Sequence, residues 1–316
     1  MWRSLLVILA LQASLGLAQT LWIPLASQGS IEALSLATKT PVAQITSPNL
    51  NSPEGIAFDR QGNLWVTDEF NSTLLEFTPA ELAHSGAPTP AVVLKSDTQG
   101  SLSIPSGLAF DAKGDLWVAN QFNSTLVEFT PAELAHSGAP TPAVVLGGFQ
   151  QKTIRLPTDL AFDQQGNLWV VSPEKDEILE FTPAELAHSG APTPAVVLKS
   201  DTQGSLSAPT GLAFDAKGDL WVSNSYGNTI VEFTPAELAH SGAPTPAVVL
   251  KDDGKGSLSS PSGLLFDTQG NLWVTNAGNA TLVAFRPDQL VSGAPTPATH
   301  LAIPGLAASF GFLALH

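Results

Sequence analysis

Short apolar runs separated by turn residues occupy most of the chain and follow one fixed pattern. Residues 55–59 and 63–67 are two such runs, joined by the loop Arg60-Gln61-Gly62. Two β-rich runs with a short polar, glycine-containing connection are typical of a β-hairpin. Residues 74–77 and 91–94 form two further apolar runs, so one unit of the pattern predicts four antiparallel strands.

The four-run pattern recurs at a constant spacing. Its central tryptophan returns every 52 residues, and the stretch EFTPAELAHSGAPTPAVVL occurs four times without a change. Four antiparallel strands that recur every 40–50 residues or so indicate the blades of a β-propeller. The repeated tryptophans are Trp65, Trp117, Trp169, Trp221 and Trp273. The five units span about residues 51–102, 103–154, 155–206, 207–258 and 259–302.

The invariant stretch also predicts a short helix between the third and fourth strands of most blades. Thr78 precedes Pro79, and Glu81 stands at the third helical position. This is the pattern of a capping box with proline at the first helical position. Gly86 follows soon after and can end the helix.

The two ends of the chain predict how the ring closes. The segment that starts at Leu21-Trp22-Ile23 resembles the later strands of a unit, whereas residues 303–307 resemble the first strand of one. We therefore expect residues 19–50 and 303–316 to share a sixth blade. The prediction is an all-β, six-bladed β-propeller of four-stranded antiparallel blades, closed by N- and C-terminal strands in one blade.

Residues 1–18 resemble a secretory signal peptide. An early positive charge at Arg3 is followed by an apolar run, with small residues at Gly16 and Ala18. The apolar run is interrupted by polar residues and is shorter than the roughly 20 residues that span a membrane. We therefore expect cleavage after Ala18, a secreted or extracytoplasmic location, and no membrane span in the mature chain.

Composition excludes several classes of partner and chemistry. The chain has 13 Lys and Arg against 28 Asp and Glu, a formal charge of −15, and it has no cysteine. A strongly acidic protein repels polyanions, so we expect no nucleic-acid partner. Without cysteine there is no disulfide, thiolate zinc site or cysteine nucleophile. We expect the mature protein to be a monomer.

The stretch PEGIAFDRQGNLWVTD at residues 53–68 resembles the NHL repeat, and the likeness recurs in all five units. The same frame is similar to the regucalcin and gluconolactonase family, whose members hydrolyse sugar lactones with a divalent cation at the central tunnel. That resemblance implies a metal ligand directly after the first proline of a unit. The residues at that position are Glu54, Ser106, Thr158, Thr210 and Ser262.

Among these five residues only Glu54 offers a carboxylate. One carboxylate does not make a calcium site, which takes six to eight oxygen ligands. We therefore expect no bound metal and no cofactor. A divalent cation such as calcium enters only with an alternative function, in which the protein is a metal-dependent lactonase-like or lyase-like enzyme with its site at the central tunnel.

Three repeated residue types suggest chemistry but have structural explanations. The tryptophans lie in strands with apolar residues on both sides, which favours packing between blades over sugar stacking. Asp59 and its copies precede a glycine by three positions and lack the alternating acidic pattern of a calcium loop, which favours a turn. His84 and its copies occur once per blade, too far apart to share a metal. We expect no paired carboxylates outside turns.

A functional site is expected where the repeats differ. The loops between second and third strands and the connections between blades vary, and both open on one face of the ring. We expect aromatic anchors at Phe70, Phe122 and Tyr226 on this face. Aromatic side chains beside carboxylates and amides suit a protein or carbohydrate ligand. The expected polar contacts are Glu54, Asp68, Asn120, Glu174, Asn224 and Asn276.

The first functional hypothesis is therefore an exported, non-catalytic binding or scaffold protein that recognises a protein or carbohydrate on the variable-loop face. No catalytic residue is assigned. The tunnel enzyme remains the alternative. The structural alternative to a ligand site is that the variable segments are ordinary surface loops, which vary freely in sequence. A third hypothesis is that the four identical helix-bearing segments form a scaffold rim.

Overall fold

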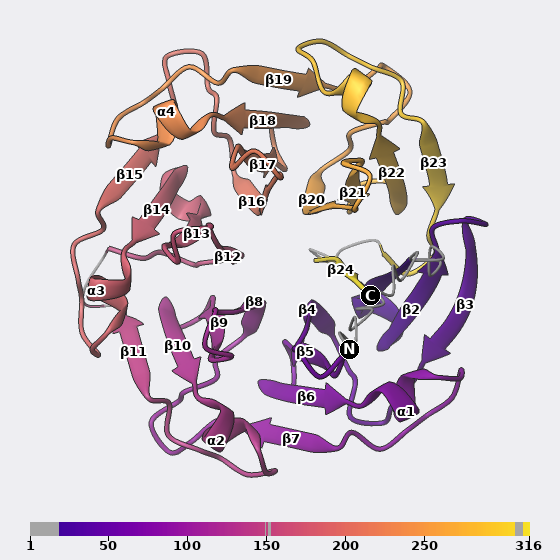
Figure 1. The fold of residues 1–316 in the computed structure, drawn as a ribbon, viewed down its shortest axis with the longest axis vertical. Coiled ribbons are helices and arrows are strands. Elements are labelled where there is room, and N and C mark those ends of the chain that lie inside the picture. The colour runs from indigo at the N-terminus through magenta and orange to yellow at the C-terminus, as the bar shows by residue number, and fades with distance from the viewer. Residues whose placement is uncertain (1–18, 149, 151–152, 307–311) are drawn as a thin grey trace, which may run out of the picture.

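The apolar runs of each repeat pair as antiparallel strands, and the strands form six four-stranded sheets around a ring (Figure 1). The computed structural model describes residues 19–148, 150, 153–306 and 312–316. The predicted signal peptide at residues 1–18 lies outside the described residues. The six-bladed β-propeller predicted from the sequence is confirmed.

We number the blades from the first complete repeat. The strands of blade 1 are β4 (Pro53–Phe58), β5 (Leu64–Asp68), β6 (Thr73–Phe77) and β7 (Val92–Lys95). Those of blade 2 are β8 (Pro105–Phe110), β9 (Leu116–Asn120), β10 (Thr125–Phe129) and β11 (Val144–Gly147). Those of blade 3 are β12 (Leu160–Phe162), β13 (Leu168–Ser172), β14 (Glu177–Phe181) and β15 (Val196–Lys199).

The remaining blades follow the same order from the centre of the ring outward. The strands of blade 4 are β16 (Pro209–Phe214), β17 (Leu220–Asn224), β18 (Thr229–Phe233) and β19 (Val248–Lys251). Those of blade 5 are β20 (Pro261–Phe266), β21 (Leu272–Asn276), β22 (Thr281–Phe285) and β23 (Thr299–Ala302). Those of blade 6 are β24 (Ala314–Leu315), β1 (Thr20–Leu25), β2 (Ser30–Ser35) and β3 (Thr40–Ile45).

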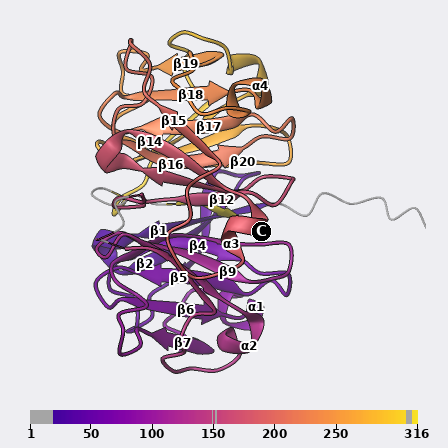
Figure 2. The ribbon, with the colours of Figure 1, turned by 90° about the vertical axis from the view of Figure 1, so that its left-hand side faces the viewer.

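The predicted helices are present and begin as the capping box requires. In blade 1, Thr78 N donates to Glu81 Oε2 (2.6 Å), and Glu81 N donates to Thr78 Oγ1 (3.4 Å). The helices lie on one side of the ring (Figure 2), and none in the described part of the chain is long and apolar enough to span a membrane. They are α1 (Pro79–Leu82), α2 (Pro131–Leu134), α3 (Pro183–Leu186) and α4 (Pro235–Leu238).

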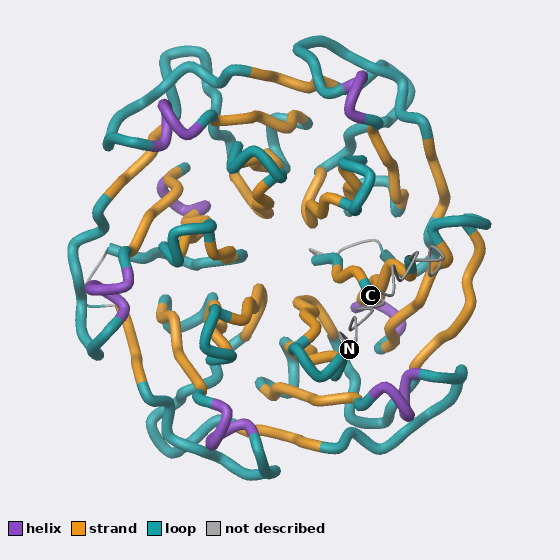
Figure 3. Tube along the Cα trace, in the orientation of Figure 1, coloured by secondary structure: helices purple, strands orange, loops and turns teal. Residues whose placement is uncertain are grey.

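Three shorter 3-10 turns complete the helical elements, which Figure 3 colours purple. In blade 5, η3 (Pro287–Gln289) occupies the position that the α-helices take in blades 1 to 4. The other two, η1 (Ala26–Gln28) and η2 (Pro173–Lys175), lie between the second and third strands of their blades.

The tryptophans join neighbouring blades, as the sequence predicted. Trp65 meets Phe110 of the next blade edge-on, with ring centroids 6.5 Å apart and an interplanar angle of 71°. Trp221 meets Phe266 in the same way at 5.9 Å and 66°. Each hydrophobic cluster combines side chains from two consecutive blades, so the core lies between the sheets rather than within one of them.

The invariant stretch also attaches each blade to the one before it. Ser137 Oγ accepts a hydrogen bond from Val93 N (3.0 Å), and Gly138 forms an isolated parallel bridge with Leu94 of the preceding outer strand. The same serine and glycine contacts join blades 1, 3, 4 and 5 to the blade before each of them. We call this Ser-Gly contact the strap, and it explains why the segment carries Ser-Gly after each helix.

The ring closes in blade 6, where the C-terminal strand β24 pairs with β1, but the predicted position of this strand was wrong. The sequence comparison placed its start at residues 303–307, whereas the structure places Ile303 to Leu306 in the turn after β23. Trp22 pairs with Ala314, as Trp65 pairs with Ala57 in blade 1. The true opening strand therefore lies about ten residues later, because pairing with β1 sets its register.

Close approach of the inner strands leads to a prediction. A Cβ on Gly211 would overlap the Ser262 carbonyl oxygen of the next blade, whereas a Cβ on Gly242 would meet nothing within 4 Å. We expect Gly211→Ala to lower the free energy of unfolding by about 1–3 kcal/mol, because overpacking displaces neighbouring backbone. Gly242→Ala is the matched control and should change it little. Urea denaturation measures both, and equal effects would contradict this explanation.

Candidate functional site

Three aromatic side chains project from corresponding turns on the variable-loop face. Each turn between a second and a third strand closes on a residue with positive φ, such as Ser72 (50°) or Asn228 (48°). The side chain two positions earlier lies at the tip. Phe70, Phe122 and Tyr226 occupy this position and are 72%, 59% and 85% exposed. The structure thus places the three predicted anchors at the surface, one in each of blades 1, 2 and 4.

Glu174 occupies the same turn position in blade 3 but makes an ion pair. Arg155 donates to its carboxylate through Nε and Nη2, both at 2.9 Å. This bidentate contact raises the pKa of Arg155 and lowers that of Glu174. Glu174 therefore fixes the incoming connection of its own blade while leaving part of its side chain exposed.

The predicted polar contacts at the ends of the second strands lie inside the structure. Asn120 Oδ1 accepts from Ser103 N (3.0 Å), and Asn120 Nδ2 donates to Ser101 O (2.9 Å). The other members of this group hold the connections before their blades in a similar way. All four side chains, Asp68, Asn120, Asn224 and Asn276, are fully buried. We assign them to loop anchoring rather than to ligand contact.

Glu54 lies on β4, one of the innermost strands of the ring (Figure 1). Its side chain is 3% exposed and accepts a hydrogen bond from Ser106 Oγ (3.2 Å) of the next blade. Burial raises the pKa of Glu54 well above its usual range, and the negative charge of nearby Glu69 raises it further. This raised pKa favours the protonated form of the Glu54 carboxyl.

Asp159 is a second buried acid beside the centre of the ring, and the sequence analysis missed it. The other complete units carry glycine here, so the signal was the departure of one unit from the common pattern. Asp159 accepts from Leu160 N (2.9 Å) and from Leu212 N of the next blade (3.0 Å). Burial raises the pKa of Asp159 to about 7 despite these hydrogen bonds.

The helix-bearing face contains a pocket that recurs between consecutive blades, and this too was missed. In the pocket between blades 4 and 5, Trp221 and Glu232 of one blade face Phe266 and Leu290 of the next. Similar linings recur in the gaps between blades 1 and 2, 2 and 3, and 3 and 4. In ring order the four pockets have volumes of about 580, 440, 330 and 520 Å³.

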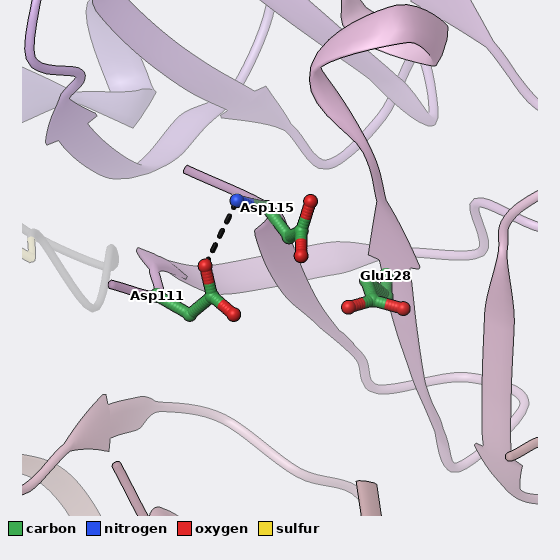
Figure 4. Close-up of side chains that lie close together, drawn as sticks. All are labelled: Asp111, Asp115 and Glu128. Carbon is green, nitrogen blue, oxygen red and sulfur yellow. Dashed lines mark hydrogen bonds between the residues drawn. The ribbon is translucent and has the colours of Figure 1, made fainter. Parts of the chain in front are cut away.

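Two of these pockets lie beside three carboxylates that are close together, two of which line the pocket, contrary to the expectation of no paired carboxylates outside turns. Figure 4 shows Asp111, Asp115 and Glu128 in blade 2, where each can offer an oxygen within 4.8 Å of the others. Burial, followed by the charge of Asp115, raises the pKa of Glu128 to about 7. The equivalent cluster in blade 4 is Asp215, Asp219 and Glu232.

Sequence comparison identifies no family for this chain: no family model matches it, and no curated protein matches it. The likeness to NHL and regucalcin-type propellers therefore stays a prediction. Solved structures show the fold instead. A Bacteroides caccae protein of unknown function superposes with a TM-score of 0.66 at 13% identity, covering 94% of this chain and 98% of its own.

Two further solved structures show how varied the proteins with this fold are. A chain of the nidogen–laminin complex gives a TM-score of 0.68 at 18% identity, covering 94% of this chain and 98% of its own. Virginiamycin B lyase from Staphylococcus aureus gives 0.60 at 15% identity, covering 87% and 80%. At these identities the likeness establishes the propeller fold and leaves function to the site.

The raised pKa of Asp159 gives a prediction for stability. Its folded pKa of about 7 lies above the ordinary aspartate pKa of 3.8, so the folded state binds more protons than the unfolded state between these pH values. The free energy of unfolding therefore falls as pH rises from 4 to 8, by up to about 4 kcal/mol for this group.

We expect Asp159→Asn and Asp159→Gly each to weaken this pH dependence. Asparagine keeps one acceptor for the neighbouring amides without the titration, and glycine is the residue of the other complete units. Urea denaturation at pH 4, 6 and 8 measures the effect. A pH dependence identical to that of the parent protein in both variants would contradict the assignment.

Proposed function

We propose that this protein is an exported, non-catalytic propeller that binds a protein partner through its variable-loop face. The observation that supports this most is the set of exposed aromatic tips at Phe70, Phe122 and Tyr226. Each of the three side chains is more than half exposed, and aromatic residues are enriched at protein interfaces.

The surroundings of the aromatic tips support a role in recognition rather than free sequence variation of surface loops. The anchoring residues beneath them, such as Asn120 and Asn224, are buried and fully hydrogen-bonded. A rigid turn holds its tip side chain in place before binding, which lowers the entropy cost of association. The tip position differs between blades, with glutamate in blade 3 and glycine at Gly278 in blade 5. An asymmetric partner can therefore distinguish the blades.

The nidogen–laminin chain, which shares the fold, comes from a structure of a protein complex. That neighbour shows that a propeller of this size can take part in protein binding, and it supports a protein rather than a glycan partner. We propose further that the mature chain starts after residue 18, is secreted or extracytoplasmic, and is a monomer before it meets the partner.

Removal of the aromatic tips tests this function. We expect the triple variant Phe70→Ala, Phe122→Ala, Tyr226→Ala to lose specific protein capture, because truncated hot-spot aromatics typically cost 2 kcal/mol or more each, about thirtyfold in affinity. The measurement is quantitative pull-down from the culture fluid or envelope extract of the source cells, with bound proteins identified by mass spectrometry.

A control replaces two exposed apolar residues elsewhere, Val42→Ala and Val291→Ala, and should leave capture unchanged. Proteins retained equally by the parent, the control and the triple variant would contradict the proposal. If the protein binds a glycan array and this binding depends on the three tips, the partner is a carbohydrate and not a protein.

A second candidate function is acid–base catalysis at the centre of the ring, as a lactonase or lyase. The specific observation behind it is the buried Glu54 carboxyl with its raised pKa beside Glu69. A carboxyl group whose pKa is raised can protonate a leaving group, and the neighbouring carboxylate can act as the base. A divalent cation at this place would have the carboxylate oxygens of Glu54 and Glu69 as ligands. They are fewer than the six to eight oxygens that calcium normally takes.

Lactone hydrolysis separates the two candidates. If the centre is catalytic, the chain hydrolyses a sugar lactone with or without added calcium, and Glu54→Gln lowers the rate by about 10²–10⁴-fold through loss of the proton donor. The half-buried Glu32→Gln is the control and should keep the parent rate. Our first proposal expects no hydrolysis above background in any of these samples, measured by pH-stat titration.

A further inference from the structure

The five complete blades contain two versions of the same turn after the first strand, and the difference concerns one side chain. In blades 1, 3 and 5, asparagine donates to the carboxylate of the turn aspartate. Asn167 Nδ2 lies 2.8 Å from Asp163 Oδ2, and Trp169 Nε1 donates to the same oxygen at 3.0 Å. The equivalent bonds in blades 1 and 5 have similar lengths.

In blades 2 and 4 this asparagine is replaced by aspartate. In blade 4, Asp219 takes the place of the amide donor beside Asp215, and Glu232 of the adjacent strand completes three carboxylates within 4.8 Å. Register pairs Glu232 directly with Trp221, so the acid stands next to the indole. Replacement of asparagine by aspartate thus exchanges an amide–carboxylate hydrogen bond for three neighbouring carboxyl groups, of which Asp219 and Glu232 hydrogen-bond to each other.

The indole of Trp221 loses its partner in this arrangement. Its side chain is 2% exposed, and Nε1 has no hydrogen-bond partner among the described residues. The equivalent N–H groups in blades 1, 3 and 5 reach the turn aspartate. As in those blades, Asp215 Oδ1 accepts from two backbone amides of the turn, Lys217 N (2.8 Å) and Asp219 N (3.0 Å), so the difference lies in the indole alone. A buried donor without a partner destabilises the fold and calls for an explanation.

We propose that Asp215, Asp219 and Glu232 bind a hard divalent cation of the calcium class, and that the equivalent Asp111, Asp115 and Glu128 bind a second one. The cation would balance the carboxylates of blades 2 and 4, where blades 1, 3 and 5 have the N–H donor of an asparagine amide. With its charge balanced, Asp215 can turn Oδ2 toward Trp221 Nε1, as the turn aspartates of blades 1, 3 and 5 do.

The pocket gives such an ion access and room for water. Asp215, Trp221 and Glu232 line the space of about 520 Å³ between blades 4 and 5. Three carboxylates provide three to six oxygens, and water from the pocket completes the six to eight that calcium takes. Few protein ligands predict a weak site, with a dissociation constant of about 10⁻⁴–10⁻³ M, as in extracellular modules. Burial raises the pKa of Glu232 to about 7, and Asp219 adds to this rise.

Lys217 is the internal counter-charge that competes with this proposal. Its Nζ lies 3.9 Å from Asp219 Oδ2, but its side chain is 79% exposed. An exposed ion pair of this kind contributes little and can separate without breaking the fold. If Lys217 were the intended partner, its removal would destabilise the cluster; if a cation binds, Lys217→Gln should tighten binding by removing a competing charge.

Terbium luminescence tests the proposal, because Tb³⁺ replaces calcium at oxygen sites and emits when energy passes from a nearby tryptophan. We expect tryptophan excitation of the full mature chain to give saturable Tb³⁺ emission, with two sites per chain, that Ca²⁺ displaces. Asp219→Asn, which recreates the residue of blades 1, 3 and 5, should remove one site. Asp115→Asn with Asp219→Asn should remove both, with at least a tenfold loss of Ca²⁺ affinity by calorimetry.

Two controls make the result specific. Asp288→Asn removes an exposed acid outside the clusters and should leave both sites intact. Asn167→Asp should create a third site, because blade 3 already carries Asp163 and Glu180 in the required positions. No saturable emission from the parent chain, or emission unchanged in the double variant, would overturn the proposal.

Discussion

The packing of each blade's tryptophan against the next blade is the interaction on which the rest of the molecule depends. At Trp22, Trp65, Trp169 and Trp221 this packing is an edge-on contact with a phenylalanine. A four-stranded blade has two apolar faces and cannot bury either one alone. Trp65, for example, is 2% exposed only because blade 2 covers it. Every blade therefore needs a neighbour on both sides, and an open arc of blades would leave two apolar faces in water. The ring must close, which is why the two chain termini meet in blade 6.

This dependence separates the two faces of the ring. On the helix-bearing face, the invariant segment provides the capping box, the buried leucine of the helix and the Ser-Gly strap to the preceding blade. Changes there weaken contacts between blades, so the segment can vary little without a structural cost. On the opposite face, the turn residues with positive φ, such as Asn228, hydrogen-bond to the next blade, whereas the tip side chains of Phe70 and Tyr226 are mostly exposed. Phe70, Glu174 and Tyr226 can differ because the residues beneath them hold the turn.

The period of the repeat was enough to predict the blades, the helices and the closure of the ring, because these depend on local patterns. Features that depend on register were not predictable in the same way. Asp115 and Glu128 are 13 positions apart in the sequence and meet only because Glu128 pairs with Trp117 across the hairpin. The position of β24 likewise follows from its pairing with Trp22. Burial of Asn120 reflects hydrogen bonds to a connection that the pattern of apolar runs does not locate.

Asp159 shows how one residue that differs from its counterparts can change the contact between two neighbouring blades. Inner strands lie so close that a Cβ on Gly107 would meet Asp159 Cα, and the start of blade 3 must adapt. Its first strand is accordingly shorter than those of the other complete blades. The Asp159 carboxylate adds a contact between blades 3 and 4 by accepting from Leu212 N, beside the neutral bond that Thr158 Oγ1 donates to Thr210 O. Because burial raises the pKa of Asp159, the packing of blades 3 and 4 is sensitive to pH.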